Sequence, residues 1–217
     1  MTRSILKSDS LGTIYVIGET EPAAVVRDTS TARRGARWLA RALAAHEARI
    51  LQRLETNPAL PRVLAFDGIA LERSYVPGAP MHVARPSTRV YFRDAFRLLR
   101  SLHRQRIAHN DLAKEANWLC MPNDRAAIVD FQIAWHSRRR SLLFRLLARE
   151  DLRHLLKHKR TYLPGELTAR QRRLLARPSL GARLWRTLWK PVYHGVSRLL
   201  GRMPRQGPVE TRGSPHV

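Results

Sequence analysis

The sequence predicts an α+β fold in which a small antiparallel sheet with one helix precedes a larger, mainly helical part. Short apolar runs separated by turn residues fill much of the first 76 positions, which is typical of strands joined by hairpins. Apolar residues then recur at helical spacing over 88–105. These two observations together favour strands in the first part and helices in the second.

The first three strands are predicted from short runs of β-branched and apolar residues. Residues 5–17 favour two strands around a turn at Gly12, and 23–27 favour a third strand that ends in Arg27. Gly12 and Gly18 are the glycines of this hairpin, so a full G-x-G-x-x-G loop is absent. An ordinary hairpin turn therefore also explains Gly12.

One helix and two further strands complete the predicted first part. The helix spans 36–54 and has Glu47 as the only acid in its middle. Its apolar residues at helical spacing are Trp38, Leu39, Leu43, Ile50, Leu51 and Leu54. Strands at 63–66 and 69–72 follow, joined by an Asp67-Gly68 turn.

A connector and a second helix lead into the centre of the chain. The chain is expected to leave the sheet from Arg73 onward, and nearby prolines favour a connector. The helix over 88–105 is expected to turn its apolar residues to a core. It delivers the chain to the stretch 107–131.

The stretch 107–131 has the residues best suited to chemistry. Asp111 and Asn117 lie on a polar segment, and an apolar run then ends in Asp130. Two carboxylates and an amide in this order suit metal-assisted phosphoryl transfer. One acid can orient an attacking hydroxyl, while the amide and the second acid hold Mg²⁺ against nucleotide phosphates. His109 is expected to brace this segment rather than to act as a base.

This arrangement resembles the catalytic loop and metal-binding aspartate of the protein-kinase-like superfamily. Within it, the stretch looks most similar to small bacterial lipopolysaccharide-core kinases that act on Kdo and heptose, and less similar to RIO and aminoglycoside kinases. In this sequence Arg27 closes the third predicted strand, and an Arg33-Arg34-Gly35 turn follows. Kdo kinases show a similar arrangement. Lipopolysaccharide kinases also show a similar Asp130-Phe131-Gln132 motif. The resemblance covers residues 5–160 approximately.

The resemblance implies a two-lobed fold, with an N-lobe over 1–76 and a C-lobe with the catalytic loop over 77–178. It also implies ATP and Mg²⁺ as cofactors. The catalytic residues it indicates are Asp111 and Lys114, the metal ligands are Asn117 and Asp130, and the nucleotide-binding residues are Gly12, Arg27 and Glu47. Arg27 stands where protein kinases have a lysine, and Glu47 is expected to pair with it. A surface arginine on an edge strand and a solvated helix carboxylate are the alternatives for these two residues.

Departures from the protein-kinase pattern keep other functions open. Arg27 replaces the lysine, Gln132 replaces a glycine, and Asp111 and Asn117 are six positions apart, one more than in protein kinases. These changes also suit an inactive kinase fold that serves as a membrane-associated scaffold. Protein serine/threonine kinase activity is a further alternative, but no A-P-E motif or long activation segment follows Asp130. A small molecule or glycolipid is therefore the expected acceptor.

The net charge of the chain is strongly positive and uneven. Lysine and arginine total 40 against 17 acids, which gives a net charge of +23. Residues 1–135 have 20 basic and 13 acidic residues, a net of +7, and 136–217 have 20 and 4, a net of +16. This excess predicts acidic partners such as anionic lipid, phosphorylated glycan or nucleic acid.

The end of the chain predicts an amphipathic helix over 179–202 and a disordered tail over 203–217. Trp185 and Trp189 lie on the apolar face of this helix and cations lie opposite, which describes a helix on an anionic membrane surface. A terminal helix docked on the C-lobe is the alternative. Because the aromatic residues share one apolar face, no specific nucleic-acid binding is expected.

Cellular location is inferred from what the sequence lacks. Cys120 is the only cysteine, so no intramolecular disulfide is possible, and a reducing cytoplasm is expected. Neither a signal peptide nor a spanning helix is predicted. Together with the resemblance, this indicates a cytoplasmic kinase, peripheral to the inner membrane. Its expected reaction phosphorylates a hydroxyl of a lipopolysaccharide-core sugar or a related lipid-linked glycan.

Overall fold

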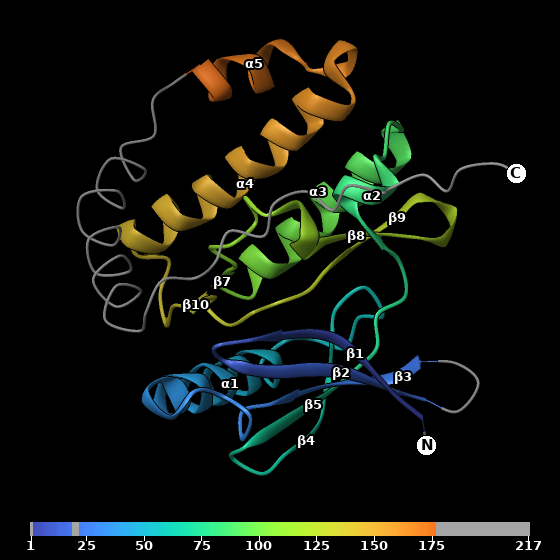
Figure 1. Cartoon of the computed structure of the whole chain (residues 1–217). Helices are drawn as coiled ribbons and strands as arrows, with labels where there is room; N and C mark the ends of the chain where they lie inside the picture. The colour runs from blue at the N-terminus through green and yellow to red at the C-terminus, as the bar shows by residue number, and fades with distance from the viewer. Residues whose placement is uncertain (1, 19–21, 177–217) are drawn as a thin grey trace, which may run out of the picture. The chain divides into compact units, whose positions relative to one another are not determined.

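The computed structural model describes residues 2–18 and 22–176, which all belong to the first structural unit of the chain, 1–182. The helix predicted over 179–202 and the disordered tail predicted over 203–217 lie outside the described residues. The described part is an α+β fold, as predicted (Figure 1). Strands and a helix come first along the chain, and a mainly helical part follows.

Within the described residues, five strands form one antiparallel sheet in the order β1-β2-β3-β5-β4. The strands are β1 (Thr2–Asp9), β2 (Gly12–Gly18), β3 (Pro22–Asp28), β4 (Val63–Phe66) and β5 (Ala70–Ser74). Helix α1 (Arg37–Leu51) packs against β4 and β5. The predicted strands are confirmed. The expectation that the chain leaves the sheet from Arg73 is wrong, because Arg73 pairs with Val25 inside the sheet.

The second part is built on α3 (Arg89–Arg104) and α4 (Leu142–Tyr162), which pack side by side (Figure 1). The shorter elements are β6 (Ala79–Pro80), α2 (Met81–Ala84), β7 (Ile107–Ala108), β8 (Trp118–Met121), β9 (Arg125–Ile128), β10 (Trp135–His136) and α5 (Ala169–Ala176). Strand β8 pairs antiparallel with β6 and β9, and β7 pairs with β10. No helix among the described residues combines the length and apolar character needed to cross a bilayer.

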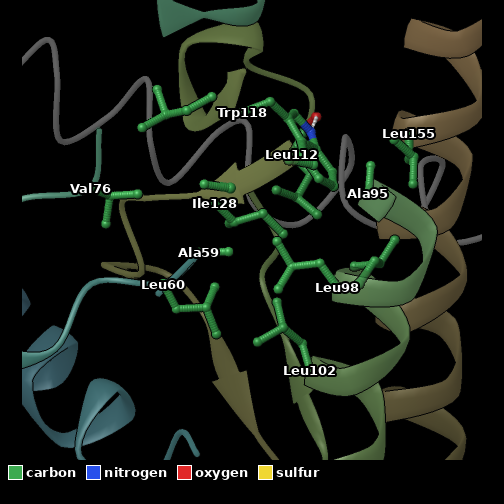
Figure 2. Packing of buried hydrophobic residues seen from close by; sticks show 14 of the residues in the cluster. Ala59, Leu60, Val76, Ala95, Leu98, Leu102, Leu112, Trp118, Ile128 and Leu155 are labelled. Atoms are coloured by element: carbon green, nitrogen blue, oxygen red, sulfur yellow. Dashed lines mark hydrogen bonds between the residues drawn. The ribbon is translucent and has the colours of Figure 1, made fainter. Parts of the chain in front are cut away.

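Helix α3 and the β8–β9 hairpin bury the main hydrophobic core. The helix begins after Thr88, whose side chain accepts the Tyr91 N–H. Its predicted core residues are buried, except Phe96, which is partly buried against the core; the buried ones are Tyr91, Phe92, Ala95, Leu99 and Leu102. Figure 2 shows residues of α3, β9 and α4 gathered around one interior. Trp118 is fully buried there, and its indole Nε1 donates to the Leu112 carbonyl at 3.3 Å. This core therefore holds both sides of the segment between Leu112 and Trp118.

Helix α1 buries small side chains rather than its largest one. Ala40, Ala44 and Ala48 are buried at helical spacing, and Glu47 on the same side is fully buried. Trp38, counted among the helically spaced apolar residues, is 69% exposed. The alanines let the helix approach the sheet closely, and Trp38 projects from another face.

Two glycines occupy turn positions with left-handed backbone angles. Gly12 has a φ of 119°, and a Cβ there would lie 2.2 Å from the Asp28 carbonyl oxygen. The predicted Asp67-Gly68 turn is confirmed: Asp67 Oδ1 accepts the Ile69 N–H at 2.8 Å, and Gly68 has a φ of 88° in open space. Gly12 thus allows the backbones of β2 and β3 to approach closely, whereas Gly68 provides the backbone angles that its turn requires.

We expect Gly12→Ala to lower the free energy of unfolding by about 2–4 kcal/mol, because it combines backbone strain with a clash against β3. Gly68→Ala adds strain alone and should cost about 1 kcal/mol. Gly165→Ala, a control in open space, should change stability by less than about 0.5 kcal/mol. Urea unfolding measures all three. A Gly12→Ala effect as small as that of Gly165→Ala would contradict the packing described.

Candidate active site

The segment from His109 to Asn117, called here the HND loop, brings three predicted site residues into contact. Lys114 Nζ donates to Asp111 Oδ2 at 2.6 Å, and Asn117 Nδ2 donates to the same oxygen at 3.0 Å. Asn117 is 4% exposed, whereas Asp111 is partly open to solvent. The cluster therefore joins the proposed acid, the proposed lysine and the proposed metal-binding amide.

Two consecutive tight turns span the six-position step between Asp111 and Asn117. The Lys114 N–H donates to the Asp111 carbonyl at 3.3 Å, and the Asn117 N–H donates to the Lys114 carbonyl at 3.2 Å. The second turn is the 3₁₀ turn Glu115–Asn117. Asn117 Nδ2 also donates to the Asp111 carbonyl at 3.0 Å. The longer spacing is thus compatible with a direct contact between the two side chains.

The remaining oxygens of this cluster are open. Neither Asp111 Oδ1 nor Asn117 Oδ1 accepts a hydrogen bond from a residue in the described ranges. The hydrogen bonds from Lys114 and Asn117 both go to the other carboxylate oxygen of Asp111. The cluster therefore holds its side chains in place and leaves two oxygens available for a ligand.

His109 braces the loop, as expected. It is fully buried, its Nε2 lies 3.1 Å from the Val129 carbonyl oxygen, and its ring meets Phe131 edge-on with centroids 4.6 Å apart. Val129 and Phe131 flank Asp130. His109 therefore couples the HND loop to the segment that carries the second proposed metal ligand.

A buried carboxylate on α4 anchors the HND loop. Asp151 has no solvent exposure, and its two oxygens accept the His109 N–H at 2.8 Å and the Asn110 N–H at 2.9 Å. Asn110 has a φ of 65°, and a left-handed residue lets successive N–H groups converge on one anion. His103 Nε2 lies 3.2 Å from Asp151 Oδ2.

Sequence reasoning assigned no role to Asp151. The available signal was its position: Asp151 stands on the same helical stripe as the buried residues Phe144 and Leu155. A carboxylate at a core position of a helix must find buried donors, because an unpaired buried charge is costly. That signal indicates a buried partner, but it does not identify the HND loop as that partner.

Asp130 follows β9 in a left-handed conformation, with a φ of 68°. Non-glycine residues adopt this region rarely and are enriched there at functional sites. The preceding Val129 N–H donates to the Asn117 carbonyl at 3.0 Å, and the following Phe131 N–H donates to Glu47 Oε1 at 3.4 Å. Backbone contacts on both sides thus hold Asp130, while its carboxylate receives no hydrogen bond from a described residue.

Glu47 pairs with Arg73, so the expected pairing of Glu47 with Arg27 is wrong. Arg73 Nη1 donates to Glu47 Oε1, and both side chains are buried. The β3–β5 register pairs Val25 with Arg73 and Arg27 with Leu71, which places Arg27 and Arg73 on one face of the sheet. The sequence assignment missed Arg73 because it placed this residue outside the sheet.

Arg27 directs its guanidinium at Gln132. With the amide oxygen turned toward Arg27, Gln132 Oε1 lies 2.7 Å from Nε and 2.8 Å from Nη2. Burial lowers the pKa of Arg27, and the nearby Glu47 carboxylate opposes this decrease, as does Asp130. Arg27 and Gln132, two positions that depart from the protein-kinase pattern, therefore contact each other.

Gly12 is placed on the strand beside these residues rather than in the HND loop. Its missing side chain makes room for the Asp28 carbonyl of β3, the strand that also carries Arg27. The predicted site residues thus fall into two groups. The first group comprises Asp111, Lys114 and Asn117. The second comprises Arg27 and Glu47, and Glu47 accepts the N–H of Phe131, the residue after Asp130.

Comparison with known proteins assigns no family to this chain. No protein-family model matches it, and no curated protein matches it either.

Metal binding can be tested against the donors present. Among the described residues, no group of three or more His, Cys, Asp or Glu side chains could hold a metal ion by itself. The open donors are the Asn117 amide oxygen and the Asp130 carboxylate, and hard oxygen donors of this kind suit Mg²⁺. Mg²⁺ commonly binds through one or two protein oxygens and completes its shell with phosphate and water. The residues therefore fit a magnesium ion that arrives with a nucleotide.

We expect Glu47 to be coupled energetically to Arg73 more strongly than to Arg27. Breaking a buried ion pair by removing one partner costs about 3–5 kcal/mol, so Glu47→Gln and Arg73→Met should each destabilise the fold by this order. A double-mutant cycle measured by urea unfolding should give a coupling above about 1 kcal/mol for this pair and less for Glu47 with Arg27→Met. Equal coupling to Arg27 would restore the pair expected from the sequence.

Asp151→Ala should destabilise the fold by about 3 kcal/mol, because it leaves the buried His109 N–H and the partly buried Asn110 N–H without an acceptor. Lys157→Ala is the control on the same helix: Lys157 is exposed, so the loss of its side chain should cost less than about 1 kcal/mol. Thermal and urea unfolding of both variants provide the comparison. Similar losses for the two variants would show that Asp151 does not anchor the loop.

Proposed function

We propose that this protein is a kinase with a two-lobed, protein-kinase-like fold that transfers a phosphoryl group from ATP to an alcohol hydroxyl. One observation supports this proposal most directly. The HND loop holds Asp111 and Asn117 side by side with an open oxygen on each, and Asn117 is bonded through its carbonyl to the residue preceding Asp130. Phosphoryl transfer needs little from a protein beyond such positioning and charge stabilisation.

Asp111 and Lys114 have distinct proposed roles. Asp111 receives the acceptor hydroxyl at its open Oδ1 and takes the proton as the new oxygen–phosphorus bond forms and the bond to the leaving ADP oxygen breaks. Lys114, bonded to Oδ2 of the same carboxylate, provides a positive charge beside the transferred group. When bound, Mg²⁺ neutralises charge on the phosphates, and Asn117 and Asp130 are its proposed protein ligands.

The nucleotide-binding roles fall to the strand side of the site. Arg27 is the proposed cation for the phosphates, and Gly12 keeps the β1–β2 hairpin close to the strand that carries it. Glu47 acts indirectly: its carboxylate binds Arg73 and accepts the N–H of Phe131, next to Asp130. Glu47 is therefore a positioning residue in this proposal.

The proposed acceptor is a hydroxyl of a lipopolysaccharide-core sugar or a related lipid-linked glycan. Two features support it. The HND loop and the Asp130-Phe131-Gln132 motif resemble those of lipopolysaccharide-core kinases, and only residues 131–141 connect Asp130 to α4, which is too short for a long peptide-binding segment. The net charge of +23 also suits a phosphorylated glycan and a site of action at the cytoplasmic face of the inner membrane.

An inactive, membrane-associated scaffold is the second candidate function. The observation that favours it is the contact between Arg27 and Gln132, because this guanidinium is engaged by the protein rather than free for phosphates. Glu47 Oε2, however, is buried and has no hydrogen-bond partner in the described part of the chain. The Glu47 carboxylate also attracts Arg27. The guanidinium is therefore not committed to Gln132 alone. Nucleotide binding separates the two candidates.

Calorimetric titration with ATP should show binding that requires Mg²⁺, and Asn117→Ala and Asp130→Asn should each weaken it by at least about tenfold. Asp111→Asn should bind Mg²⁺ and ATP normally but lose about 10²–10⁴-fold in phosphoryl transfer to glycolipids that carry Kdo or heptose. Asp124→Asn, a matched control in the β8–β9 turn, should change neither quantity.

The outcomes distinguish the proposals. A wild-type chain that binds no ATP with Mg²⁺ would contradict the kinase and favour the scaffold. Full turnover in Asp130→Asn would contradict the proposed metal ligand. Transfer to serine- or threonine-containing peptides rather than to glycolipids would replace the proposed acceptor and keep the kinase.

A further inference from the structure

A groove between α3 and the start of α4 is lined mainly by arginines. Its volume is about 730 Å³. Five arginines line it, Arg100 and Arg104 from α3 and Arg140, Arg145 and Arg149 from the start of α4 and the residues before it. None of the described residues that line it is acidic. The two helices that form it lie side by side in Figure 1.

The five arginines present uncompensated charge. All are exposed, and none forms an ion pair with a carboxylate of the described residues. Other arginines of the fold, such as Arg73 and Arg125, do pair with acids. Because like charges gathered in one groove repel each other, this arrangement favours binding of an anionic partner.

The groove has a packed floor. Phe144 is buried, and its ring meets His103 edge-on with centroids 6.3 Å apart. His103 in turn contacts the buried carboxylate of Asp151 at 3.2 Å. The arginines therefore project from a rigid base formed by both helices, so the groove has a defined position on the fold.

Exposed leucines border the arginines on α4. Leu142 is 75% exposed and Leu146 is 39% exposed. Residues three and four apart are neighbours on a helix, so Leu142 lies beside Arg145 and Leu146 beside Arg149. Apolar side chains in solvent next to a row of cations are typical of a surface that lies in a membrane interface.

We propose that this surface, comprising the five groove arginines with Leu142 and Leu146, docks on an anionic lipid bilayer. The arginines bind lipid phosphates, and the leucines enter the boundary between headgroups and acyl chains. This binding does not depend on the proposed kinase activity. It would hold the body of the fold on the membrane independently of any contribution from residues 179–202.

Two other occupants are less compatible with the charges and side chains present. Residues 177–217 contain Glu210 as their single acid, so this segment has little negative charge to offer the arginines. A single-stranded nucleic acid would be expected to stack on exposed rings of Phe, Tyr or Trp. Among the described residues that line the groove, Phe144 is the one side chain of this kind, and it is buried.

Vesicle flotation of the full chain without nucleotide tests the proposal. The wild type should bind vesicles of phosphatidylcholine and phosphatidylglycerol and should not bind vesicles of phosphatidylcholine alone. Each arginine near an anionic surface strengthens binding roughly fivefold, so Arg104→Gln/Arg145→Gln/Arg149→Gln should bind at least about tenfold more weakly. Leu142→Ser/Leu146→Ser should also weaken binding although the charge is unchanged, and high salt should weaken binding of the wild type.

Matched controls separate this surface from bulk charge and bulk hydrophobicity. Arg41→Gln/Arg53→Gln/Arg62→Gln removes the same charge from exposed positions outside the groove and should bind like the wild type. Val83→Ser/Val90→Ser removes apolar side chains that are exposed elsewhere on the fold, where Val83 is 63% and Val90 is 44% exposed. This variant should also bind like the wild type. Circular dichroism of every variant confirms that it is folded.

Several results would overturn the proposal. Unchanged binding in the groove variant would assign membrane binding to another part of the chain, and an equal loss in the control arginine variant would reduce it to net charge. Full competition by soluble glycerol phosphate would indicate a site for a free phosphate rather than a bilayer. Preferential binding of single-stranded RNA, lost in the groove variant, would assign the surface to nucleic acid.

Discussion

The geometry of the candidate site depends on one buried carboxylate, Asp151. Its two oxygens accept the N–H groups of His109 and Asn110. Asp151 lies on α4, which follows the Asp130 segment in the sequence. The HND loop has little regular structure of its own, so its backbone needs acceptors from elsewhere in the fold. With this end of the loop held by Asp151 and the other end held by the buried Trp118, Asn117 is positioned to donate to Asp111.

A second set of contacts connects the sheet to the segment around Asp130. Glu47 on α1 binds Arg73 of β5 and accepts the Phe131 N–H, while Arg27 of β3 contacts Gln132. The arginine and the glutamine are both unusual beside the protein-kinase pattern, and their contact gives them a common explanation. The guanidinium of Arg27 and the side-chain amide of Gln132 form one interaction between the sheet and the segment after Asp130.

Local patterns predicted much of the fold, and distant pairings were missed. Helix α3 was predictable because Thr88 caps it and its apolar residues recur at helical spacing. The polar residues of the HND loop were predictable because they are close together in the chain. Arg73 and Asp151 were not predictable, because their partners Glu47 and His109 lie 26 and 42 positions away. The predicted residues Ile50 and Leu51 of α1 are buried, but its buried alanines were missed, since alanines give a weak hydrophobic signal.

The central claim is that Asn117 and Asp130 hold one metal ion beside Asp111, and a crystal structure with Mg²⁺ and a non-hydrolysable ATP analogue tests it most directly. The account predicts one ion with Asn117 Oδ1 and an Asp130 carboxylate oxygen both about 2.0–2.1 Å away, in contact with the phosphates. It also predicts Asp111 Oδ1 open toward the terminal phosphate. An ion bound by neither side chain, or a nucleotide bound elsewhere on the protein, would contradict the account.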